Sequence, residues 1–101
     1  MDHRDSFLRY LGIEKRYSRN TVRAYGDDLE EFLNFLSSDG IKFDPALIDS
    51  KHIRSWIDFM MDNGMAASSV HRKISCLRSF FKYLRKEGVI SRDPMEKVVL
   101  P

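Results

Sequence analysis

The 101-residue chain has few of the features that mark specialised classes of protein. Cys76 is its single cysteine, so no disulfide can form within the chain, and one thiol of the buried type is typical of a reducing cytoplasm. No stretch approaches the roughly 20 apolar residues that span a bilayer. The charged residues 1–5 have no apolar run behind them, so we see no signal peptide. We therefore expect a cytoplasmic protein with no membrane partner.

Motifs for catalysis and metal binding are also missing. The three histidines are scattered, and neither the H-E-x-x-H nor the C-x-x-C spacing of metal sites is present, nor is a glycine-rich phosphate loop. The carboxylates Asp27, Glu30 and Glu31 could suggest an acid–base or metal site, but a solvated helix face is the better interpretation because no His or Cys clusters with them. Cys76 lies beside an apolar stripe and is interpreted as a small core residue. We expect no enzyme activity, no cofactor and no small-molecule substrate.

What the chain does have is helical periodicity. Hydrophobic residues make up 43% and charged residues 32% of the sequence, which is ordinary for one globular domain. Apolar residues recur at steps of three and four in four segments, and no segment alternates as a strand does. The first expected helix covers about 3–15, the second starts at Ser18 and ends at Gly40, the third starts at Asp49 or Ser50 and ends at Gly64, and the fourth starts at Ser68 or Ser69 and runs to Gly88.

The apolar stripes predict an all-α domain in which neighbouring helices pack as pairs around a shared core. Gly26 lies inside the second helix, where close approach of another backbone would explain it, and Asp93-Pro94 predicts a last short turn. The stripes are Phe7, Leu8 and Leu11; Val22, Tyr25, Leu29, Phe32, Leu33 and Leu36; Ile53, Trp56, Ile57, Met60 and Met61; and Val70, Ile74, Leu77, Phe81 and Leu84.

The positive charge of the chain is concentrated in one segment. The net charge is only +2, with 17 basic and 15 acidic side chains. Residues 69–87, however, carry six Lys or Arg and a single acidic residue, Glu87, for a net charge of +5, whereas the rest of the chain sums to −3. This asymmetry is typical of a protein that presents one element to a polyanion.

Within the fourth expected helix, basic and hydroxyl side chains form a continuous row. His71, Ser75, Arg78, Lys82 and Arg85 recur at steps of four, three, four and three, and no acidic residue stands four positions away within the helix. A helix fits the major groove of DNA, where these side chain types contact phosphates and base edges. A solvated basic face is the plainer alternative, but the charge segregation favours nucleic-acid contact.

The start of the second expected helix offers a weaker candidate site. Ser18, Arg19, Asn20, Thr21 and Arg23 cluster there, next to backbone N–H groups that attract phosphate at a helix N-terminus. Capping by Ser18 would explain part of this pattern without any ligand. The acidic residues that follow should point away from DNA.

These two segments resemble a known family. They are similar to the N-terminal core-binding, SAM-like domain of tyrosine recombinases, the group that includes phage integrases and Xer-type recombinases. The similarity continues through 87–101, which resembles the exit of that domain toward the catalytic domain. The residues that carry the resemblance are SRNTVRAY at 18–25 with Asp28, Leu29 and Phe32, then SVHRKIS at 69–75, LRSFF at 77–81 and Tyr83-Leu84.

The resemblance implies a four-helix orthogonal bundle of two helix pairs with a short C-terminal turn, forming half of a clamp around duplex DNA at a recombination half-site. Residues 1–101 would be this DNA-binding domain, and other recombinase protomers would be its partners in the full-length protein. The catalytic domain, which carries the tyrosine nucleophile of the family, would begin where this chain stops, at Pro101. The tyrosines present here, Tyr10, Tyr17, Tyr25 and Tyr83, are therefore not candidates for the nucleophile, and the last two are interpreted as core.

In that family the second and fourth helices face the major groove. Two departures from its pattern are Ser69, where Thr is common, and Asp93, where Asn is common before Pro. The resemblance and the charge pattern together predict that the DNA-binding residues are Ser18, Arg19, Asn20, Thr21 and Arg23, and Ser69, His71, Arg72, Lys73, Ser75, Arg78, Lys82 and Arg85.

Two alternatives stay open on the sequence. The chain could be a helical protein-interaction module whose basic face docks on an acidic protein surface, or a standalone DNA-binding regulator. Competition by heparin or duplex DNA against a protein partner would separate the first alternative from the main interpretation.

Overall fold

A computed structural model describes residues 2–100 and contains four helices: α1 (His3–Ile13), α2 (Arg19–Ser38), α3 (Ser50–Asp62) and α4 (Ala67–Lys86). No strand occurs within this described part of the chain, so the expected all-α class is confirmed. The expected exit toward a second domain can be followed only to Leu100, because Met1 and Pro101 lie outside the described residues.

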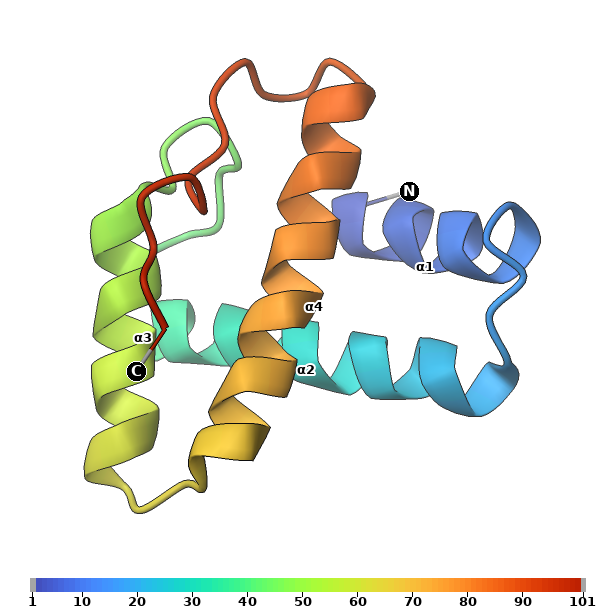
Figure 1. The fold of residues 1–101 in the computed structure, drawn as a ribbon. Coiled ribbons are helices and arrows are strands. Elements are labelled where there is room, and N and C mark those ends of the chain that lie inside the picture. Colours follow the sequence, from blue (N-terminus) through green and yellow to red (C-terminus); the bar gives the residue numbers. More distant parts are fainter. Residues whose placement is uncertain (1, 101) are drawn as a thin grey trace.

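The helices form two pairs that cross each other. In Figure 1, α1 lies along α2 and α3 lies along α4, while α4 passes across the middle of α2. Packing also joins α1 to α4 and α2 to α3, so every pair of neighbouring helices shares the core. This is the orthogonal bundle of two helix pairs that the sequence predicts. It brings residues of α2 and α4, which are far apart in the chain, into direct contact.

Two of the predicted N-caps are confirmed. Ser18 precedes α2, and its side chain accepts the backbone N–H of Thr21 at 3.2 Å. Asp49 precedes α3 and accepts the N–H of Lys51 at 2.8 Å, while the ring Nδ1 of His52 accepts the N–H of Asp49 at 3.0 Å. Both caps satisfy N–H groups that the helices themselves leave unpaired.

The predicted start of α4 is wrong. The cap residue is Ala66, which offers no side-chain hydrogen bond, and Ser68 and Ser69 already lie in the first turn. Apolar contact rather than capping sets this helix end. Met65 and Val70 occupy the two positions of a hydrophobic staple, and both pack into the core.

The predicted helix ends at Gly40, Gly64 and Gly88 are confirmed to within two residues. Each glycine follows a helix with a φ between +74° and +79°, which is the left-handed conformation that closes helices and that residues with a Cβ rarely adopt. α1 ends at Ile13, two residues before the predicted end near residue 15, and the chain then turns through Arg16 at a φ of 56°.

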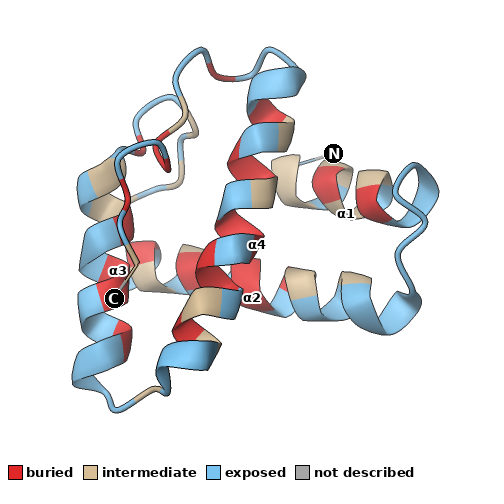
Figure 2. Cartoon of the chain, viewed as in Figure 1, coloured by how far each residue is buried: buried red, intermediate tan, exposed pale blue. Residues whose placement is uncertain are grey.

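The core contains the predicted aromatic residues and most of the predicted apolar stripes. Trp56, Phe32 and Phe81 are all buried, and Figure 2 shows buried positions recurring along each helix between exposed ones. Met61, predicted as a core residue, is 40% exposed, because its neighbour Met60 takes the inward position. The buried residues of the predicted stripes are Phe7, Leu11, Leu29, Phe32, Leu36, Ile53, Trp56, Ile57, Met60, Val70, Ile74, Leu77, Phe81 and Leu84.

The segment after α4 folds back onto the bundle. It returns beside α3 in Figure 1, and Ile90, Met95 and Val98 join the core cluster. The predicted turn after Asp93 is present, because its carboxylate accepts the N–H of Met95 at 2.9 Å. The guanidinium of Arg78 on α4 donates to the carbonyl of Val98 at 3.3 Å and so ties this segment to the helix.

Gly26 allows close packing of α1 on α2, but through side chains and not through a second backbone as predicted. A Cβ at this position would lie 3.2 Å from Leu8 Cδ1 and 3.3 Å from Arg4 Nη2. The Arg4 guanidinium donates to the carbonyl of Gly26, with its Nη2 at 3.3 Å. The absence of a side chain thus leaves room for a hydrogen bond between the two helices.

Cys76 lies at the contact of α4 with α2, as a core residue should. It is 2% exposed, and its thiol donates to the carbonyl of Tyr25 at 3.4 Å. Burial raises the pKa of the Cys76 thiol to about 12, so the reactive thiolate is scarce near neutral pH.

We therefore expect the native protein to resist iodoacetamide at mildly alkaline pH, with alkylation following only local or global opening. Mass spectrometry over a time course measures this, and the same reaction in concentrated guanidinium chloride is the control. Alkylation of the native protein as fast as that of the unfolded chain would contradict the described packing of α4 on α2.

Candidate nucleic-acid interface

The exposed face of α4 is uniformly basic. This helix contains six Lys or Arg side chains and no Asp or Glu, and two of the basic residues stand in its last turn. Of the row predicted from the sequence, Ser75, Arg78, Lys82 and Arg85 are exposed, and His71 is half-buried. The 100° rotation per residue places these five on one side of the helix, adjacent to the stripe of Val70, Ile74, Leu77 and Phe81. The structure thus keeps the predicted row together on the surface.

Arg78 and Lys86 also contact the protein itself. The Arg78 guanidinium reaches the carbonyl of Val98, as described above. The Lys86 ammonium lies 5.1 Å from the centre of the Tyr10 ring, within the range of a cation–π contact. Both side chains remain exposed, so these contacts fix their direction without removing them from the surface.

Lys73, which the sequence predicts as a DNA contact, does not lie on this face. Its side chain is 6% exposed and lies between α4 and α2. Its Nζ is 3.0 Å from Asp28 Oδ1 and 2.6 Å from Glu31 Oε2. Burial alone lowers the pKa of Lys73, but the hydrogen bonds with Glu31 and Asp28 outweigh it and hold the pKa above its usual value. Lys73 is therefore a charged structural residue of the α2–α4 contact.

Asp28 is the residue that the sequence reasoning missed. Its carboxylate is 7% exposed, and the same Oδ1 atom that contacts Lys73 also accepts a hydrogen bond from Nη2 of Arg72 at 3.2 Å. Arg72 itself is 61% exposed. One buried carboxylate therefore binds one buried and one exposed cation. A signal was present, because Asp28 stands between Tyr25 and Phe32 at steps of three and four, within the apolar stripe of α2.

The neighbouring carboxylates are only partly the solvated face that the sequence predicts. Asp27 is exposed. Glu31 is half-exposed but bound to Lys73, and Glu30 lies 3.8 Å from Nη2 of Arg4. No group of three His, Cys, Asp or Glu side chains in the described part of the chain could hold a metal ion.

The start of α2 presents a second polar surface. Ser18, Arg19, Asn20, Thr21 and Arg23 are all exposed, and the first turn contains no acidic residue. The hydroxyls of Ser18 and Thr21 lie 2.9 Å apart and form a local pair at the helix end. This surface carries two cations beside the positive end of the helix dipole, so it favours an anion electrostatically.

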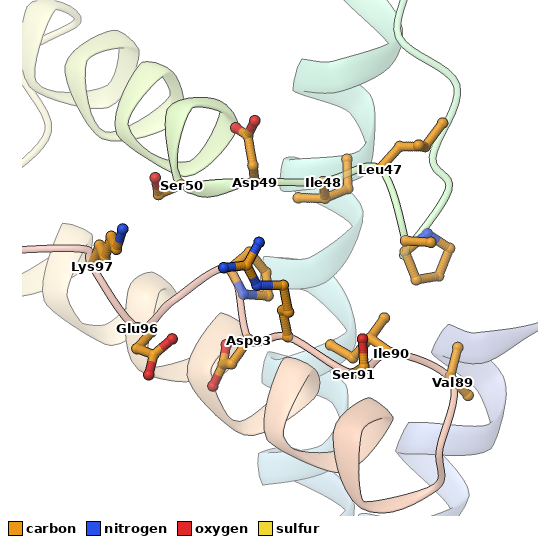
Figure 3. A pocket seen from close by; sticks show the side chains of 14 residues that line it. Leu47, Ile48, Asp49, Ser50, Val89, Ile90, Ser91, Asp93, Glu96 and Lys97 are labelled. Carbon is orange, nitrogen blue, oxygen red and sulfur yellow. The ribbon is translucent and has the colours of Figure 1, made fainter.

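A separate hollow lies between the loop before α3 and the segment after α4. Figure 3 shows it between residues 45–50 and residues 89–97. Its volume is about 510 Å³. Its lining alternates carboxylates such as Asp49 and Asp93 with cations such as Lys97, and no residue of α4 contributes to it. The hollow therefore lacks the uniformly positive charge of the α4 face.

None of the helices in residues 2–100 is long and apolar enough to cross a membrane.

Comparison with known proteins decides the family. Residues 5–88 match the family described as phage integrase, N-terminal SAM-like domain. The chain belongs to this family. The matched range of this N-terminal SAM-like domain contains both α2 and α4. The buried residues Ile90, Met95 and Val98 come after the matched range.

The relatives of this SAM-like domain are tyrosine recombinases. It is 37% identical over 94 residues to tyrosine recombinase XerC of Pediococcus pentosaceus, and the aligned part is 93% of this chain and 31% of that protein. It is 37% identical over 97 residues to tyrosine recombinase XerD of Listeria innocua, covering 96% and 33%. It is 38% identical over 96 residues to tyrosine recombinase XerC of Bacillus subtilis, covering 94% and 31%.

The SAM-like domain thus spans about a third of the length of these curated relatives. No solved structure gives a significant match to it.

Proposed function

We propose that this domain binds duplex DNA as the non-catalytic, DNA-clamping part of a tyrosine recombinase. The observation that carries the proposal is the exposed face of α4, on which Arg78, Lys82 and Arg85 line up with no carboxylate anywhere on the helix. A uniformly positive surface on a helix of this length suits a polyanion better than it suits a protein surface that carries charges of both signs. The family membership and the tyrosine recombinase relatives support the same function.

The docking follows from the shape of the two helices. The exposed side of α4 enters the major groove, where Arg78, Lys82 and Arg85 contact phosphates and Ser75 and His71 reach toward base edges. The start of α2, with Arg19 and Arg23, contacts a neighbouring phosphate through its side chains and the N-terminal end of the helix. The expected DNA contacts of α2 and α4 thus remain as proposed, except for the buried Lys73.

Recombination itself requires more than this domain. We infer that strand exchange takes place in the part of the relatives that the chain does not span, and that this domain holds the half-site while other recombinase protomers assemble on the same DNA. Affinity of the domain alone comes mainly from phosphate contacts, so it is weak and falls steeply with salt.

The test is a fluorescence-anisotropy titration with a labelled duplex of about 30 base pairs, three turns of B-DNA at 3.4 Å per step, at several salt concentrations. Lys82→Ala combined with Arg85→Ala should weaken binding and lower the slope of log K against log salt by about 0.9 for each phosphate that the variant no longer neutralises. Arg78 is left in place because it also ties down Val98.

Lys51→Ala combined with Arg54→Ala is the matched control, because it removes two exposed cations from α3. We expect this pair of changes to leave the slope as it is. An unchanged slope in the α4 variant, or equal weakening in both variants, would refute the placement of α4 on DNA. A folded domain that binds no duplex even at low salt would favour the alternative of a protein-interaction module.

A further inference from the structure

A buried carboxylate on α2 holds an exposed arginine on α4. Asp28 is 7% exposed at its side chain and Arg72 is 61% exposed, and their Oδ1 and Nη2 atoms are 3.2 Å apart. An ordinary surface arginine samples many rotamers, and ordering such a side chain costs free energy on binding. Here the partner carboxylate is fixed by burial, so it restricts the guanidinium before any ligand arrives.

The other contacts of the cluster show that Asp28 has a cationic partner even without Arg72. Lys73 already has Glu31 Oε2 at 2.6 Å and Asp28 Oδ1 at 3.0 Å. The two carboxylates therefore satisfy Lys73 without help, and the contact with Arg72 is an additional use of Asp28. Its effect falls on the exposed guanidinium.

The contact leaves most of the arginine available. A guanidinium has five N–H donors that point outward within one rigid plane, and one Nη2 contact to Asp28 leaves donors along the other edges of that plane. Arg72 stands three residues before Ser75, on the edge of the exposed α4 face that lies toward α2. It therefore lies between the basic row of α4 and the middle of α2. Asp28 comes seven residues after Thr21, about 10 Å along the helix axis.

We propose that Asp28 is a positioning residue for DNA binding: it fixes the guanidinium of Arg72 at the crossing of α2 and α4, so that the outward donors of Arg72 contact duplex DNA between the two helices. This rests on the proposed function, because it assigns a role within the same surface. Lys73 and Glu31 have a different part, which is to join the two helices.

Whether DNA binding weakens or strengthens when the charge of Asp28 is removed separates a positioning role from a purely electrostatic one. Asp28 carries a negative charge that repels phosphate, so removing that charge without any loss of positioning strengthens DNA binding. If Asp28 positions Arg72, its removal weakens binding instead, because Arg72 must then be ordered by the DNA. Glu31→Gln removes the same charge from the same cluster but leaves the contact between Asp28 and Arg72 intact.

The experiment measures the Kd of Asp28→Asn, Glu31→Gln, Arg72→Ala and the Asp28→Asn/Arg72→Ala double variant for the same labelled duplex. Circular dichroism first establishes a temperature at which each is folded. We expect Asp28→Asn to raise the Kd about two- to tenfold, the cost of ordering one long side chain, and Glu31→Gln to leave it unchanged or lower it. In the Arg72→Ala background, Asp28→Asn should have no further weakening effect.

Arg72→Lys keeps the charge and tests the proposal even where Asp28→Asn unfolds. A lysine ammonium cannot hold the side-on contact and present a planar set of donors outward, so binding should weaken although the charge is unchanged. The proposal is overturned if Asp28→Asn binds as tightly as the parent while Arg72→Ala does not, if Arg72→Ala loses nothing, or if Arg72→Lys binds like the parent. Absence of duplex binding by the unchanged domain is a different result, which overturns the proposed function itself.

Discussion

Lys73→Met is expected to lower the free energy of unfolding by about 3–5 kcal/mol, the usual cost of removing one partner from a buried ion pair. The change leaves Asp28, at 7% side-chain exposure, with Arg72 as its remaining cation and with Glu31 three residues away on the same helix. Domains of this size have a total stability of about 5–15 kcal/mol, so the loss is a large share of it. Urea denaturation followed by circular dichroism measures the difference.

Lys82→Met is the matched control for this experiment, because it makes the same change on the exposed face of α4 and should alter stability by no more than about 0.5 kcal/mol. Lys73→Met combined with Asp28→Leu should recover much of the loss, since both buried charges are then gone. The description of the cluster is wrong if Lys73→Met proves as mild as Lys82→Met.

The pH dependence of the buried pair follows from the direction of the shift. The pKa of Lys73 is raised in the folded protein by its hydrogen bonds with Glu31 and Asp28, which outweigh burial. A raised lysine pKa means that its contribution to stability is complete below the pKa of an unfolded lysine and is lost only as the pH rises through the folded value. The cost of Lys73→Met should therefore be fully present at neutral pH.

Phe7→Ala is expected to have a similar effect, about 3–5 kcal/mol. Phe7 is fully buried, and its ring centre lies 5.3 Å from that of Phe80 and 5.5 Å from that of Tyr83. α1 has only 11 residues, and helices shorter than about 12–15 residues are marginal on their own. Loss of this side chain should therefore release α1 from α4 as well as open a cavity.

Thermal unfolding and amide hydrogen exchange measure both parts of this prediction. The midpoint should fall by about 4–8 °C for each kcal/mol of destabilisation, and the amides of α1 should lose protection before those of α4. Phe59→Ala is the matched control, because Phe59 is 51% exposed. Equal destabilisation in the two variants, or unchanged protection of α1, would contradict the role given to Phe7.

The sequence was sufficient to predict the helices and most of their buried faces. Apolar residues at steps of three and four predict a helix wherever one face packs on a core, and three of the glycines mark helix ends through their left-handed conformation. The predicted start of α4 is wrong because capping by Ser68 or Ser69 competes with apolar packing of Met65. Local propensity gives no measure of that packing.

The candidate site was predicted less completely. The exposed positions of Arg78, Lys82 and Arg85 follow from helix geometry alone. The charge of Lys73 predicts an exposed position, but its place in the helix predicts burial, because it precedes Leu77 at a step of four, in line with the buried stripe. Its partner Asp28 lies 45 residues earlier, and no periodicity within one helix predicts a pairing over that separation.

The returning C-terminal segment changes where the folding unit ends. The match to the N-terminal SAM-like domain ends at residue 88, but Ile90, Met95 and Val98 are as much part of the hydrophobic core as residues of the helices. A chain cut at Gly88 would lose these three side chains and the carbonyl that Arg78 binds. A mechanical pull on Leu100 should likewise reach the middle of α4 through the hydrogen bond between Val98 and Arg78, which couples the C-terminal segment to the basic helix.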